Sequence, residues 1–192
     1  MIIILASVSL GQGAEEVDKY ISSIAQGDDN ALAELYRATG KIVYAYAFSI
    51  LRNTYDAEDV LHDTYLSVCR SAANYTSKGK PLAWIFTITR NLCFKKLQEN
   101  NKVADIPDED IAAFIPSKDE LSVEDKLVLG ECMKKLDSTE RQIVLLHAVC
   151  GFKHREIAEL LKLHLPTVIS KYNRALKKLR SVLQESEGID KK

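Results

Sequence analysis

The sequence is poor in residues that interrupt regular structure, and no stretch of it shows sustained alternation of apolar and polar residues. Only four prolines and eight glycines occur in 192 residues. Apolar residues instead recur three and four positions apart nearly throughout, which is the spacing of helices with one buried face. The sequence therefore predicts an all-α fold, and a hydrophobic content of 46% argues against wholesale disorder.

Motifs that hold metals or perform catalysis are missing as well. The cysteines stand at least 18 positions apart and form no CxxC pair, and the four histidines show no HExxH spacing. No glycine-rich phosphate loop and no nucleophile motif occurs. We therefore predict that the protein is not an enzyme and has no metal or cofactor. Its thiols should be reduced and mostly face the core: Cys69, Cys93, Cys132 and Cys150.

Long apolar runs are absent too. The opening run, Ile2 to Leu10, has nine residues, whereas a membrane-spanning helix needs about 20, and it lacks the basic residues that begin a secretory signal. We expect no membrane insertion and a cytoplasmic location.

Charge is segregated along the chain although the net charge is only −1. Residues 70–98 contain six basic and no acidic residues, and residues 134–183 contain eleven basic and four acidic ones, a local net of +7. Between them, residues 105–125 contain eight acidic residues and one lysine, a local net of −7. Two basic blocks around an acidic connector indicate two surfaces that bind a polyanion, joined by a segment that avoids the polyanion or mimics it.

The helical pattern divides into two small domains joined by an acidic linker. In the first domain, Asp28 or Asp29 can cap a long helix. The next helix begins at Asp56, and Pro81 opens the last one, which ends near Asn100. In order along the chain we predict a tail (1–13), a first helical domain (14–100), the acidic linker (101–125), a second helical domain (126–185) and a tail (186–192).

The second domain ends in the layout of a helix-turn-helix. A short helix, 154–161, and a three-residue turn, 162–164, precede a longer basic helix, 165–179. Upstream, Asp137 and Glu140 have the spacing of a capping box. The polar stripe of the last helix can contact phosphates and base edges in a major groove: Thr167, Ser170, Lys171, Arg174 and Lys178. The alternative is an amphipathic surface helix whose lysines only keep it soluble.

The acid-free block 70–98 interleaves aromatic residues with cations, as in surfaces that stack unpaired bases. Trp84 also has core spacing, which we take as its main role. For Tyr75, on the polar loop 74–80, core packing and base contact are equally open. Just upstream, four carboxylates form either a solvated helix start or a docking surface for a basic partner protein: Asp56, Glu58, Asp59 and Asp63.

Three motifs together resemble a known family. Tyr55 to Leu66, YDAEDVLHDTYL, resembles the D-A-E-D stretch of sigma-70 region 2 in the small extracytoplasmic-function (ECF) group. Pro81 to Leu92, PLAWIFTITRNL, resembles that group's aWLyrIARN helix, and Glu140 to Leu161 with Thr167 to Leu179 is similar to region 4. The resemblance covers roughly residues 28–100 and 130–183, in the family's order and with no room for region 3.

This resemblance implies an ECF-type sigma factor, which binds core RNA polymerase and directs promoter recognition, DNA melting and transcription initiation. The acidic helix around Asp56 and Asp63 would dock on the β′ clamp helices. The polymerase β flap and an anti-sigma factor are further implied partners. The last helix would bind the minus-thirty-five element of promoter DNA. The minus-ten element, with one flipped base, would contact the helix from 81 and its preceding loop through Asn74, Tyr75, Lys78, Lys80, Thr87, Arg90, Asn91 and Lys95.

Several positions depart from the family's pattern. Family members often have glycine where Lys162 and Pro166 stand, a basic residue where Ile169 stands, arginine where Lys171 stands, and a serine cap where Lys153 stands. Because lysine lacks the bidentate fork that arginine offers to guanine, we expect weak base specificity from this helix.

Two other functions remain open. A sigma-like adaptor would sequester an anti-sigma factor without touching DNA. A stand-alone helix-turn-helix regulator would bind a symmetric operator, but this function leaves the acidic helix and the aromatic loop unexplained.

Overall fold

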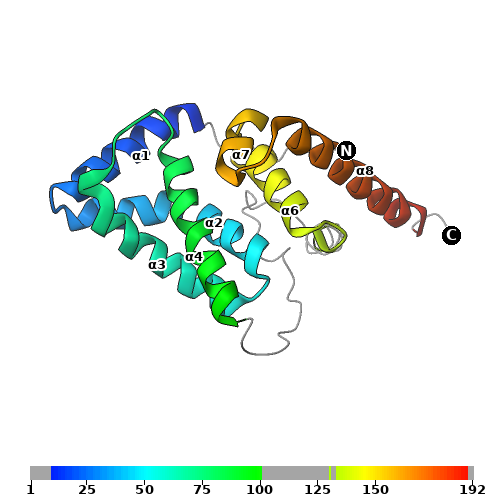
Figure 1. Cartoon of the computed structure of the whole chain (residues 1–192), viewed down its shortest axis with the longest axis horizontal. Helices are drawn as coiled ribbons and strands as arrows, with labels where there is room; N and C mark the ends of the chain where they lie inside the picture. The colour runs from blue at the N-terminus through cyan, green and yellow to red at the C-terminus, as the bar shows by residue number, and fades with distance from the viewer. Residues whose placement is uncertain (1–9, 101–129, 131–132, 190–192) are drawn as a thin grey trace. The chain divides into compact units, whose positions relative to one another are not determined.

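The computed structural model describes residues 10–100, 130 and 133–189, which form helices with short connections and contain no strand (Figure 1). The predicted all-α fold is confirmed. The described residues separate into two compact units, one with α1 to α4 and the other with α6 to α8. No helix in these ranges is long and apolar enough to cross a membrane. The predicted linker, 101–125, lies outside the described residues.

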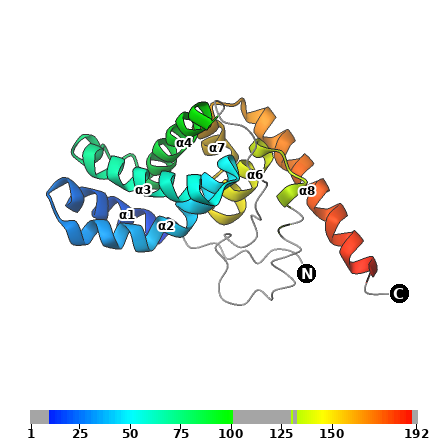
Figure 2. The same cartoon turned by 90° about the horizontal axis from the view of Figure 1, so that it is seen from below.

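Four helices and a short 3-10 turn build the first unit: α1 (Leu10–Ala25), α2 (Asp29–Leu51), α3 (Thr54–Ser71), η1 (Ala72–Asn74) and α4 (Pro81–Asn100). α2 contacts α1, α3 and α4 (Figures 1 and 2). Residues 43–50 of α2 are all buried, as expected for a stretch of helix that is apolar on nearly every side. α2 is therefore the centre around which this unit packs.

Side-chain caps determine where α2 and α3 begin. Asp28 Oδ1 accepts a hydrogen bond from the Asn30 amide at 2.9 Å, which confirms one of the two predicted caps. Asn53 caps α3, because its side chain accepts from the Asp56 amide at 2.9 Å. α3 therefore begins at Thr54, two residues before the expected start.

One large apolar residue near the end of α3 faces solvent and not the core. Leu66 is 55% exposed. Leu66 directly follows Tyr65, and this one-residue step rotates its side chain by about 100° around the helix axis, away from the buried stripe. The buried stripe consists of Ala57, Val60, Leu61, Thr64, Tyr65 and Val68. The exposed Leu66 lies on the same helix as the predicted docking carboxylates.

The second unit contains α6 (Ser138–Val144), the π-helical turn η3 (Leu145–Val149), α7 (His154–Leu161) and α8 (Leu165–Ile189). The predicted capping box is present: Asp137 Oδ1 accepts from the Glu140 amide at 2.8 Å, and Glu140 Oε2 accepts from the Asp137 amide at 3.0 Å. The helix then widens at η3, where the Cys150 amide donates to the Leu145 carbonyl five residues back.

α7 and α8 form the predicted helix-turn-helix. The turn depends on Lys162, whose φ of 56° and ψ of 44° are left-handed. The Leu163 amide then donates to the Ala158 carbonyl at 2.9 Å, which closes the end of α7. α8 continues to Ile189, beyond the expected helix end at residue 179 and into the segment expected to be a tail. α1 likewise begins at Leu10, before the expected domain start at residue 14.

The cysteines pack as the sequence predicted. Cys93 and Cys150 are buried and Cys69 is half-buried, all three as free thiols, whereas Cys132 lies outside the described residues. Burial raises the pKa of Cys93 and of Cys150 to about 12. Neither thiol is therefore a nucleophile at neutral pH.

Candidate nucleic-acid interface

α8 presents a polar stripe to solvent. Thr167, Ser170 and Arg174, three of the five residues predicted to contact DNA on this helix, are exposed. Continuing their spacing of three and four along α8 leads to further exposed polar residues that the prediction left out: Asn173, Lys177, Arg180 and Ser181. Hydroxyl, amide and cationic groups on one side of a helix can bind phosphates and base edges.

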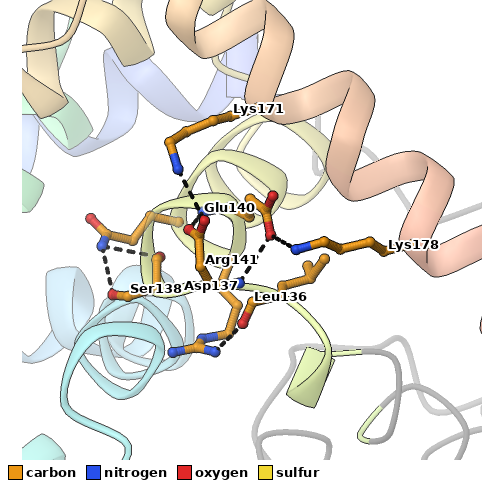
Figure 3. Close-up of polar contacts among 8 residues, drawn as sticks. Leu136, Asp137, Ser138, Glu140, Arg141, Lys171 and Lys178 are labelled. Atoms are coloured by element: carbon orange, nitrogen blue, oxygen red, sulfur yellow. Dashed lines mark hydrogen bonds and ion pairs between the residues drawn. The ribbon is translucent and has the colours of Figure 1, made fainter.

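The other two predicted residues, Lys171 and Lys178, reach towards α6 (Figure 3). Lys171 Nζ lies 3.0 Å from Asp137 Oδ2, and Lys178 Nζ lies 2.6 Å from Glu140 Oε2. Their side chains are 24% and 37% exposed. Because the two lysines are seven residues apart, they share a face of α8, and this face pairs with the N-terminal end of α6.

Glu140 is the centre of this network and is fully buried. Its Oε2 atom accepts from both the Lys178 ammonium and the Asp137 amide. Burial alone would raise the pKa of Asp137, but the hydrogen bond from the Glu140 amide and the Lys171 ammonium together hold that pKa below its ordinary value. The capping box thus fixes the start of α6, and two ionic contacts hold α8 against it.

Three rings connect η3, α7 and α8. The rings of His147 and His154 stack with centroids 4.3 Å apart, and the Tyr172 ring lies 4.8 Å from each. His147 Nδ1 lies 2.7 Å from the Phe152 carbonyl oxygen; since a carbonyl only accepts, this nitrogen carries a proton. Burial and the neighbouring His147 lower the pKa of His154. The cluster therefore favours a neutral His154.

α4 exposes one polar face within the acid-free block. Thr87, Asn91 and Lys95, all predicted to contact the minus-ten element, are exposed and four residues apart. Phe94, one of the aromatic residues that the sequence interleaves with cations in this block, is exposed beside them. The guanidinium carbon of Arg90 lies 4.5 Å from the Phe94 ring centroid, a cation–π contact. An exposed ring next to cations suits stacking with unpaired bases.

The loop before α4 is connected to α1 through a carboxylate. The Tyr75 hydroxyl donates to Asp18 Oδ1 at 2.5 Å, and the Ser77 hydroxyl donates to Asp18 Oδ2 at 2.6 Å. The half-buried Tyr75 ring packs against the half-buried Trp84 ring with centroids 4.6 Å apart. The remaining residues predicted to bind DNA here are exposed: Asn74, Lys78 and Lys80.

The four carboxylates predicted to dock a partner differ in exposure. The Asp56 side chain is only 14% exposed; it lies 3.4 Å from Lys96 Nζ and accepts from Asn100 Nδ2 at 2.6 Å. Asp59 pairs with the same lysine at 2.8 Å but stays largely exposed. Asp56 thus ties α3 to α4, and the carboxylates that face solvent are Glu58, Asp59 and Asp63.

Two exposed apolar side chains lie on the same face of α3 as the solvent-facing carboxylates. Tyr55 is 75% exposed. Leu66 is eleven residues further on, three helical turns, and therefore points the same way. A surface that combines exposed apolar residues with charge of one sign is typical of a protein-binding site.

Two family models match the chain. Sigma-70 region 2 matches residues 35–103, which include most of α2 and all of α3 and α4. Sigma-70 region 4 matches residues 126–179, which include α6, α7 and the exposed stripe of α8 up to Lys177. Together the two models cover well over half of the chain, which belongs to the sigma-70 family.

Related proteins indicate which group of the sigma-70 family the chain belongs to. The chain is 26% identical over 180 residues to the ECF RNA polymerase sigma factor SigK of Mycobacterium ulcerans, covering 90% of this chain and 96% of the relative. It is 28% identical over 184 residues to SigK of Mycobacterium bovis strain BCG / Pasteur 1173P2, with the same coverage. The chain is a sigma factor of the extracytoplasmic-function group, as its motifs indicated.

Two solved structures share the fold. CnrH, solved in complex with the cytosolic domain of CnrY, matches with a TM-score of 0.61 and 21% identity over 88% of this chain and 98% of CnrH. The sigma factor RpoE of Bartonella quintana, solved with the anti-sigma factor NepR, matches with a TM-score of 0.67 and 19% identity over 79% of this chain and 96% of RpoE. At these identities the likeness concerns the fold alone.

Proposed function

We propose that this chain binds core RNA polymerase and directs it to promoters through two DNA-binding surfaces, one on each helical unit. The observation that carries this proposal is the presence of two exposed polar faces that carry cations, one on α8 and one on α4 with its preceding loop, together with a separate exposed acidic and apolar face on α3. Promoter binding needs the first two faces, and attachment to the polymerase uses the third, which would repel DNA.

On the second unit, the stripe of α8 that starts at Thr167 binds the duplex minus-thirty-five element. Ser170 and Arg174 lie at its centre and are free to face a groove. Arg174 is the residue there best suited to bidentate recognition of guanine or phosphate. Lys171 and Lys178 contribute to DNA binding mainly indirectly, by holding α8 in place, because their ammonium groups are paired with carboxylates of the same unit.

On the first unit, α4 and its preceding loop bind the melted minus-ten element. Thr87, Asn91 and Lys95 follow the backbone along one face, and the exposed Phe94 ring offers a stacking surface. Arg90 contributes its charge beside that ring. The loop receives one flipped base, whose extrusion costs a few kcal/mol that the surface contacts offset.

Attachment to the polymerase uses α3 and the second unit. Glu58, Asp59 and Asp63, with Tyr55 and Leu66 beside them, dock on the β′ clamp helices, while the second unit contacts the β flap. An anti-sigma factor binds the protein in the cytoplasm and keeps it inactive until the complex dissociates. Support for this partner comes from CnrH and RpoE, which share the fold and were solved in complex with CnrY and NepR.

Reconstitution tests the proposal. The purified chain is mixed with core polymerase and genomic DNA, and transcript start sites are sequenced; we expect starts at a small set of shared promoter sequences. Binding of an anti-sigma factor without binding of core polymerase would instead indicate a sigma-like adaptor. Tight protection of a palindrome without polymerase would indicate a stand-alone regulator. Either result would contradict the proposal.

A further inference from the structure

We propose that Asp18 of α1 is a positioning residue that holds the loop before α4 in the shape that receives the flipped base. This inference rests on the proposed function, since it explains how the same loop is held in shape. Asp18 itself does not touch DNA; it acts through Tyr75 and Ser77, whose hydroxyl groups both donate to it.

The charge pattern makes this carboxylate unusual. Residues 70–98 contain no acidic residue, as expected of a surface that approaches a polyanion. Asp18 comes from a different helix and adds a negative charge to this surface, only 2.5 and 2.6 Å from two loop hydroxyls. Such a charge weakens attraction to DNA phosphates, so its presence is explained by what it does for the loop.

The contacts fix the loop from several sides. Each carboxylate oxygen of Asp18 accepts from a different hydroxyl, so the loop is held at two points that flank Thr76. The Tyr75 ring is fixed further by the Trp84 ring on the first turn of α4. Burial and the bond to Asp18 raise the pKa of Tyr75 above its ordinary value, which keeps this hydroxyl protonated as a donor.

A loop ordered in advance binds more tightly than one ordered by its ligand. Fixing a residue costs conformational entropy, and a loop that is already fixed does not lose it when the base enters. The anchoring of Tyr75 and Ser77 therefore predicts that Asp18 favours base capture. A carboxylate that merely shielded the loop would have the opposite effect, so the sign of the change on substitution separates the two roles.

The test uses holoenzyme and a single-stranded DNA probe. The probe copies the melted strand of the promoter that gives the most transcripts in the reconstitution above. Asp18→Ala should weaken binding of this probe by about ten-fold, and Asp18→Asn, which keeps one acceptor, by less. The matched control is Glu15→Gln, which removes an exposed charge from the same helix and should leave affinity equal or slightly higher.

A mutant cycle shows whether Asp18 acts through the loop. Tyr75→Phe with Ser77→Ala removes both hydroxyls and leaves α1 intact; it should weaken binding as much as Asp18→Ala does. Adding Asp18→Ala to this pair should then have no further effect. Tyr20→Phe, which removes a hydroxyl that bonds Glu16 within α1, controls for the loss of a tyrosine hydroxyl. Core affinity and thermal unfolding are measured for every variant.

The outcomes separate this inference from the proposed function. If the wild-type chain starts no transcripts with core polymerase, the proposed function fails. If it starts transcripts and Asp18→Ala binds the probe as well as wild type or more tightly, the positioning role is overturned. A further loss when Asp18→Ala is added to the loop variant would also overturn it.

Discussion

Lys178 of α8 forms an ion pair with a carboxylate that has no exposed surface: its Nζ atom lies 2.6 Å from Oε2 of Glu140 (Figure 3). A buried carboxylate needs such a partner, because an unpaired charge inside a protein is strongly destabilising. The pair therefore couples the stability of the second unit to the position of its DNA-binding helix.

Lys178→Met should lower the free energy of unfolding of the second unit by about 1 to 2 kcal/mol, a value reduced for the partial exposure of the lysine. Hydrogen exchange at the amides of α6 and α8 measures this change. The control is Lys177→Met, which removes an exposed lysine from the next position and should change stability by less than about 0.5 kcal/mol. Equal effects of the two substitutions would show that the pair with Glu140 contributes nothing.

Arg174→Ala and Lys171→Ala should differ in their effect on the salt dependence of promoter binding. Log affinity falls linearly with log salt concentration, and each phosphate contact contributes about −0.9 to the slope. We expect Arg174→Ala to make the fall less steep by about that amount. Lys171→Ala should change it much less, since Asp137 already neutralises the lysine. Holoenzyme binding to a promoter fragment at several salt concentrations measures both slopes; a larger change for Lys171→Ala would contradict the assignment.

Lys162→Gly should stabilise the helix-turn-helix. Lys162 holds a left-handed conformation, which costs an L-residue roughly 1 to 2 kcal/mol and glycine almost nothing. After allowance for the greater freedom of glycine in the unfolded chain, we expect a gain of about 0.5 to 1 kcal/mol in urea unfolding. Lys162→Ala removes the same side chain but keeps the strain, so it should give no gain. A loss of stability in the glycine variant would refute this account.

The second unit should lose stability as the pH falls below the ordinary histidine pKa of 6.5. Burial and His147 lower the pKa of His154 in the folded state. Between the lowered and the ordinary value the unfolded chain binds the proton that the folded chain does not, so acid favours unfolding. His154→Phe keeps a ring beside His147 and Tyr172 but cannot titrate. Urea unfolding at pH 7.5 and 5.5 should show a smaller loss for this variant than for wild type; an equal loss would exclude His154 as the cause.

The sequence predicted what local rules determine. Helix spacing, the caps at Asp28 and Asp137 and the helix-turn-helix all follow from residues within a few positions of one another. The exposed part of the α8 stripe, Thr167 with Ser170 and Arg174, followed from periodicity in the same way.

The contacts that the sequence did not predict join distant segments. Lys171 and Lys178 were assigned to the polar stripe because nothing in α8 shows that Asp137 and Glu140 lie opposite them. Asp18 lies 57 residues before Tyr75, and its charge gave no sign of a role in the loop. Such pairings depend on how helices pack, which periodicity within one helix does not specify.

The wide turn η3 determines which way His147 points. A π-helical turn holds one residue more than an α-helical turn, and each α-helical residue advances the direction of side chains by about 100°. Deleting Leu145, which precedes His147, would rotate His147 by about 100° about the helix axis, away from His154 and Tyr172, while leaving Asp137 and Glu140 where they are. With the extra residue, His147 lies seven residues after Glu140 and on the same side of the helix, so this one helix contacts α8 both at Lys178 and at Tyr172.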